Sequence, residues 1–129
     1  MEILQVFFTC TLSGVCRTET GAARLDLLQG TLHGSGMTGF LVAGADEYIG
    51  LFEGEERIVL FQIESLLANG LFASIRVLRE VYPKQTLCAL WYVSKTAVAN
   101  TSAETLYAPE RLAEFIDSAL KPFAKRQRH

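Results

Sequence analysis

The side chains that could bind a metal or act as nucleophiles are few and widely spaced. The chain of 129 residues has three cysteines, Cys10, Cys16 and Cys88, and two histidines, His33 and His129. Structural zinc sites take four Cys or His ligands, usually in close pairs, and no Cys-x-x-Cys pair occurs here. The sequence therefore predicts no metal site, and it predicts buried thiols instead of a disulfide framework.

The acidic residues Glu53, Glu55 and Glu56 have the composition of an acid–base pair. They precede an apolar helical pattern, and carboxylates at a helix N-terminus are stabilised by the helix dipole. We therefore interpret them as the solvated start of a helix. His33 falls at the C-terminal end of another predicted helix, where an imidazolium is favourable.

No motif of a known catalytic site, such as G-x-S-x-G, a P-loop or H-E-x-x-H, occurs in the chain. Arg17, Arg24 and Asn100 are available as polar side chains, but they form no recognisable motif. The sequence predicts that the protein is not an enzyme. A small enzyme acting on an acyl or phosphoryl group is the alternative that these residues leave open.

Residues 34–39 read GSGMTG, which matches the dinucleotide fingerprint G-x-G-x-x-G. That fingerprint binds a pyrophosphate only where it follows a strand and opens a helix. Here it follows a predicted helix and opens a predicted strand. We therefore interpret it as a helix stop followed by a tight connection.

Composition predicts a folded protein with a substantial core. Half of the residues are hydrophobic, a fifth are charged, and the net charge is −2. This balance argues against nucleic-acid binding, and the basic ending KPFAKRQRH is typical of a solvated terminus. The apolar start MEILQVFFTCTLSG lacks the basic segment of a signal peptide and is too short to span a bilayer. We expect a cytoplasmic protein that does not bind membranes.

Hydrophobic periodicity gives the order of elements. Strands are predicted at 3–10, 37–42, 47–52, 74–81 and 86–93. A first helix begins near Thr18 to Thr20 and ends near Leu32. A second begins at Glu53 with a stripe of Val59, Leu60, Ile63, Leu66 and Leu67, and a third segment contains Pro109, Leu112, Phe115, Ile116 and Leu120.

This order predicts an α+β fold of the ferredoxin-like type. Its β-α-β-β-α-β-β sheet carries two helices on one face, and the C-terminal helical segment covers the other. We expect residues 1–95 to form the ferredoxin-fold domain. Residues 96–129 form a helical extension and basic tail packed on the same domain.

The stretch GMTGFLVAGADEYIGLFEGEERIVLFQIESLL resembles the BLUF domain, a family of blue-light sensors that use flavin. That family has a G-x-T-G strand followed by a strand ending in L-E-G, which correspond here to residues 36–39 and to Leu51-Phe52-Glu53-Gly54. The resemblance covers about residues 3 to 95. It implies a ferredoxin-like sheet with two helices that hold the isoalloxazine ring, and further helices on the other face.

The positions that the resemblance assigns to flavin chemistry depart from the family pattern. The photoactive tyrosine falls at Phe8, the glutamine at Gly50 and the flavin-binding asparagine at Leu32. A basic segment after the second helix is replaced by one that contains Leu71 and Phe72. A fifth-strand tryptophan or methionine corresponds, with a shift in register, to Trp91.

These degenerate pocket positions offer almost no side-chain donors to a flavin, so we expect large apolar residues to fill the space. The resemblance and the departures together imply a BLUF-like regulatory or protein-interaction module that has lost flavin photochemistry. No cofactor is expected, and FAD or FMN would be the group if one bound. The partner would be an unidentified protein or further copies of the chain. The alternative is a flavin-binding blue-light or redox sensor with unusual pocket contacts.

Overall fold

The computed structural model describes residues 2–12, 19–43, 47–68, 70–92 and 103–120. In chain order the elements are β1 (Ile3–Leu12), α1 (Glu19–His33), β2 (Thr38–Ala43), β3 (Tyr48–Glu55), α2 (Glu56–Ala68), β4 (Phe72–Val81), β5 (Trp91–Tyr92), α3 (Ala103–Leu106), α4 (Pro109–Phe115) and a π-helical turn, η2 (Ile116–Leu120).

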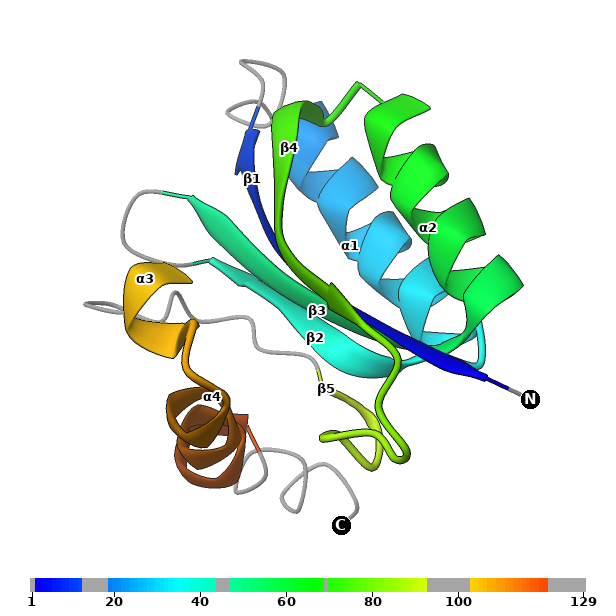
Figure 1. Ribbon diagram of the computed structural model, residues 1–129. Coiled ribbons are helices and arrows are strands. Elements are labelled where there is room, and N and C mark those ends of the chain that lie inside the picture. The colour runs from blue at the N-terminus through cyan, green and yellow to red at the C-terminus, as the bar shows by residue number, and fades with distance from the viewer. Residues whose placement is uncertain (1, 13–18, 44–46, 69, 93–102, 121–129) are drawn as a thin grey trace, which may run out of the picture.

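The five strands form one sheet in the order β4-β1-β3-β2-β5. The neighbouring strands are antiparallel except β2 and β5, which are parallel. Helices α1 and α2 lie side by side on one face, and α3 and α4 lie on the other (Figure 1). The predicted α+β, ferredoxin-like architecture is therefore confirmed.

Each face of the sheet buries its own apolar cluster. Alternate residues of a strand point to opposite faces, so β1 sends Leu4, Val6, Phe8 and Cys10 to one side and Phe7 to the other. We call the cluster beneath α1 and α2 the helix layer, and its members include Phe8, Leu32, Met37, Phe52, Leu66, Leu71, Phe72 and Trp91. We call the other the far-face cluster, and it includes Phe7, Phe40, Leu51, Cys88, Tyr92, Leu112, Phe115 and Ile116.

The start of the second helix lies three residues later than the sequence predicts. Strand β3 continues to Glu55, and α2 begins at Glu56. The reason is that β1 is long enough to pair with this extension, with Gln5 opposite Glu53 and Ile3 opposite Glu55. The interpretation of Glu53 as a solvated helix start is wrong, because it is a fully buried strand residue.

Two further predictions need correction. Leu60 and Leu67 of the expected α2 stripe are exposed, because the buried stripe is narrower and runs through Val59, Gln62 and Leu66. The expected long fifth strand is reduced to two residues. Its first part does not pair with a strand, since the backbone N–H groups of Leu87 and Cys88 donate to the Glu53 side chain instead.

The GSGMTG stretch follows α1 and opens β2, as predicted. Gly39 has a φ of +130°, and a Cβ built on it would lie 1.8 Å from the backbone oxygen of Leu51 on β3. A side chain is therefore excluded by the close approach of the two strands. This glycine is explained by strand packing and does not require a bound phosphate.

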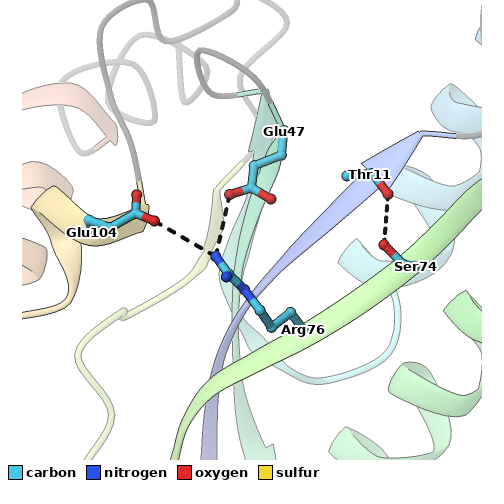
Figure 2. Close-up of polar contacts among 5 residues, drawn as sticks. All are labelled: Thr11, Glu47, Ser74, Arg76 and Glu104. Atoms are coloured by element: carbon cyan, nitrogen blue, oxygen red, sulfur yellow. Dashed lines mark hydrogen bonds and ion pairs between the residues drawn. The ribbon is translucent and has the colours of Figure 1, made fainter.

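Arginines of the edge strand β4 reach the C-terminal helices on the far face. Arg76 lies between Glu47 and Glu104, with N···O distances of 3.9 and 3.8 Å (Figure 2). Arg79 donates to the backbone oxygen of Tyr107 and stacks on its ring, with its guanidinium carbon 4.6 Å from the ring centroid. These exposed contacts supplement the apolar packing of α4 on the sheet.

Candidate functional site

The positions that the sequence assigns to a flavin pocket meet in the helix layer. Phe8, Leu32, Leu71 and Phe72 are all buried there, and Gly50 lies opposite Phe8 on the neighbouring strand. Strand, helix and loop residues from distant parts of the sequence are thus brought together. The side chains that meet are apolar, and they pack as a core.

The Phe8 ring occupies the space in which a side chain at position 50 would begin. A Cβ built on Gly50 would lie 2.3 Å from the Phe8 Cζ atom and 2.7 Å from two further ring carbons. The ring also packs edge-on against Phe52, with centroids 4.9 Å apart. An aromatic ring over a cross-strand glycine is a favourable arrangement in a sheet. In this geometry the ring of residue 8 and a side chain at residue 50 exclude each other.

A polar pair lies at another edge of the helix layer. The Trp91 Nε1–H donates to Gln29 Oε1 at 3.3 Å, and Gln29 Nε2 donates to the Leu41 backbone oxygen at 2.8 Å. Trp91 also contacts Phe52, with ring centroids 5.6 Å apart. Gln29 belongs to no motif in the sequence. Its spacing of three residues from Leu32 on the same helix is the signal that could have placed it near the pocket positions.

The apolar side chains at the predicted pocket positions do not fit the polar edge of a flavin. Isoalloxazine carbonyl and N–H groups need partners when buried, and an unpaired group costs about 1–3 kcal/mol on mutational scales. The side chains at positions 8, 32, 71 and 72 supply none. Within the described ranges, every fully buried side-chain nitrogen or oxygen already has a hydrogen-bond partner.

The far face of β3 carries a different kind of site, centred on Glu53. Its Oε2 accepts hydrogen bonds from Gln5 Nε2 and the Leu87 backbone N–H, both at 2.7 Å. Its Oε1 accepts from the Cys88 backbone N–H at 2.8 Å and, more weakly, from Thr38 Oγ1 at 3.5 Å. We call this set of contacts the Glu53 network. It joins two residues of the family motif, Thr38 and Glu53, to the connection between β4 and β5.

The remaining sequence candidates do not join a common site. Cys10 lies in the helix layer and Cys88 in the far-face cluster, on opposite sides of the sheet. Arg24 is exposed on α1, while Arg17, Asn100, Cys16 and the basic ending lie outside the described residues. Across the described part of the chain, no three His, Cys, Asp or Glu side chains gather as a metal site. No helix in that part is long and apolar enough to cross a bilayer.

Comparison by sequence finds no matching family model and no matching curated protein. Comparison by structure finds BLUF proteins. The photo-activated state of BlsA superposes with a TM-score of 0.63 at 13% identity, over 89% of this chain and 92% of that one. The dark-state structure of the BLUF protein BlrB gives 0.59 at 15% identity, over 92% and 86%.

A bacterial light-regulated adenylyl cyclase also matches, with a TM-score of 0.59 at 16% identity. The match covers 91% of this chain but only 34% of the cyclase. At these identities the comparisons speak to the fold alone. The motif, the element order and the superpositions agree, and the chain has a BLUF-like fold.

Proposed function

We propose that this chain is a BLUF-like regulatory or protein-interaction module that works without flavin photochemistry and is not an enzyme. The observation that carries the proposal is the contact between Phe8 and Gly50. The two positions that correspond to the photoactive tyrosine and glutamine hold a ring without a hydroxyl and a residue without a side chain. A hydrogen-bond switch between them has no donor or acceptor.

Packing around this contact supports the proposal. Leu32 and Phe72 are both buried in the helix layer, where polar residues would be needed to hold a flavin. Several unpaired polar groups on a ligand would lower its affinity by a few orders of magnitude, since each 1.4 kcal/mol is about tenfold. The module would act through its surface, on an unidentified partner protein or on further copies of the chain. We expect this to take place in the cytoplasm.

The test is the visible absorption spectrum of the purified protein, recorded before and after incubation with FAD or FMN and during blue illumination. A light-responsive BLUF protein, handled in parallel, controls for loading. We expect no flavin band and no uptake. A bound flavin would show that the helix layer accommodates the ring despite its apolar side chains. A red shift on illumination would refute the proposal.

Restoring photochemistry is expected to require Phe8→Tyr, Leu32→Asn and Gly50→Gln together. The structure adds a condition, because the ring at position 8 and a Cβ at position 50 cannot both keep their present places. The ring must rotate before a glutamine fits. A light response from any single substitution would contradict this expectation.

A second candidate is a flavin-binding blue-light or redox sensor with unusual contacts. It is favoured by the Gln29–Trp91 pair, which places an amide and an indole N–H in the helix layer. Titration with flavin while monitoring tryptophan emission separates the two candidates. Saturable quenching that Gln29→Leu weakens would support this sensor.

A further inference from the structure

The Glu53 network has no part in the proposed function, although it contains two residues of the motif that marks the BLUF resemblance. Glu53 is fully buried, yet each of its carboxylate oxygens accepts two hydrogen bonds. Burying a carboxylate without partners is very costly, so such a residue is tolerated only where donors are fixed around it. The donors come from three separate parts of the chain: β1, β2 and the connection between β4 and β5.

The two backbone donors are the decisive ones. Leu87 and Cys88 belong to the connection after β4, which forms no strand until Trp91. Their N–H groups point to the two oxygens of one carboxylate, at 2.7 and 2.8 Å. Charge-assisted bonds of this kind are about twice as strong as neutral ones. The connection is therefore fastened to the sheet by a side chain where strand pairing is absent.

The hydrogen bonds to Glu53 also affect the far-face cluster, because the connection between β4 and β5 contains Cys88. The Cys88 side chain is buried in the far-face cluster together with Leu112, Phe115 and Ile116 of the C-terminal helices. Fixing the Cys88 backbone thus fixes part of the surface on which those helices pack. Across the sheet, the helix layer contains none of these residues.

We propose that Glu53 is a buried latch that holds the β4–β5 connection on the sheet and keeps the Cys88 thiol and the far-face cluster closed. Opening it releases this connection and loosens the C-terminal helices while the helix layer stays folded. The latch is independent of flavin, so it stands whether or not the proposed function holds.

The experiment compares the labelling rates of two thiols in the same molecule. Intact protein is treated with N-ethylmaleimide, and peptide mapping separates Cys88 from Cys10, which is equally buried but lies in the helix layer. The test variant is Glu53→Gln, which keeps the size of the side chain but turns an NH2 group toward one of the backbone donors. The matched control is Glu55→Gln, the same change on the same strand at a partly exposed position.

We expect Glu53→Gln to raise the labelling rate of Cys88 by at least about tenfold. The loss of a hydrogen bond to a charged group should raise the population of the locally open state by about this factor or more. The rate at Cys10 and both rates in the control are expected to stay unchanged. Equal acceleration of Cys88 and Cys10 in Glu53→Gln would show that the whole fold is lost. An unchanged rate at Cys88 would show that Glu53 does not hold the connection in place. Either result would contradict the proposal.

Amide hydrogen exchange of the unmodified protein provides a second measurement that needs no variant. The Leu87 and Cys88 N–H groups are expected to exchange as slowly as the amides that pair β2 with β3. Exchange at the rate of an open chain would overturn the proposal.

Discussion

Strand β3 has opposite chemistry on its two faces within four residues. On the helix face Gly50 lies beneath the Phe8 ring, and the surrounding cluster is apolar. On the far face Glu53 accepts hydrogen bonds from three other segments of the chain. The positions that the resemblance assigns to flavin are buried in the helix layer, and Thr38 and Glu53 of the sequence motif make hydrogen bonds within the fold. The motif is therefore explained by contacts within the fold.

The largest effect on stability is expected at Glu53, on the far face of β3. Glu53→Ala should lower the free energy of unfolding by about 3–5 kcal/mol, because several buried donors lose their acceptor together. Urea unfolding measures it, with Glu55→Ala as the control, which should lie within about 0.5 kcal/mol of the unmodified protein. If the two alanine variants are equally stable, the Glu53 network does not stabilise the fold.

The packing of the helix layer is tested by truncating the side chains that fill it. Leu32→Ala should cost about 2–5 kcal/mol, as buried large-to-small changes do. Leu27→Ala is the matched control, since Leu27 lies on the same helix with 73% of its surface exposed. Phe72→Ala against the exposed Phe61→Ala repeats the comparison for aromatic residues. Equal costs within either pair would mean that the layer is not packed as a core.

The Phe8–Gly50 contact is tested by adding a methyl group. Gly50→Ala should cost about 1–3 kcal/mol, because the ring is buried and must be displaced. In a Phe8→Leu background the cost should largely disappear, and a double-mutant cycle measures this coupling. Gly30→Ala is the control: its Cβ meets no atom within 4 Å, so it should stabilise α1 by about 0.5–1 kcal/mol. Additive effects at positions 8 and 50 would contradict the interpretation that the Phe8 ring and a side chain at position 50 compete for the same space.

The smallest effect is expected at Arg76. Its two ion pairs are 3.8 and 3.9 Å long and exposed, so Arg76→Gln should cost less than about 0.5 kcal/mol in thermal unfolding. The loss should shrink further in high salt. A loss as large as that of Glu53→Ala would mean that the C-terminal helices are held by charge and not by the far-face cluster.

Local pattern was sufficient for the order of elements and for the two-sided packing of the sheet. The β-branched and aromatic run of β1 and the helical spacing of α2 are properties of neighbouring residues, so they can be read from the sequence. The pocket positions could be assigned only through the resemblance, and they remain predictions as flavin-related sites.

Glu53 could not be placed in the same way. An acidic run before an apolar stripe has the same local appearance at a helix start and at the end of a strand. What decides is the partner set, which lies 34, 35 and 48 residues away in the sequence. The exposure of Leu60 and Leu67 has a similar origin, because only the side of α2 that faces the sheet is buried, and the apolar spacing alone does not fix how wide that side is.

Trp91 is the only tryptophan of the chain, and it is buried between Phe52 and Gln29. Ultraviolet fluorescence excited at the indole therefore reports on one layer of the molecule without any label. Opening of the helix layer would shift the emission to longer wavelength, whereas release of the C-terminal helices alone would leave it nearly unchanged. The protein thus contains an optical probe that distinguishes events on its two faces.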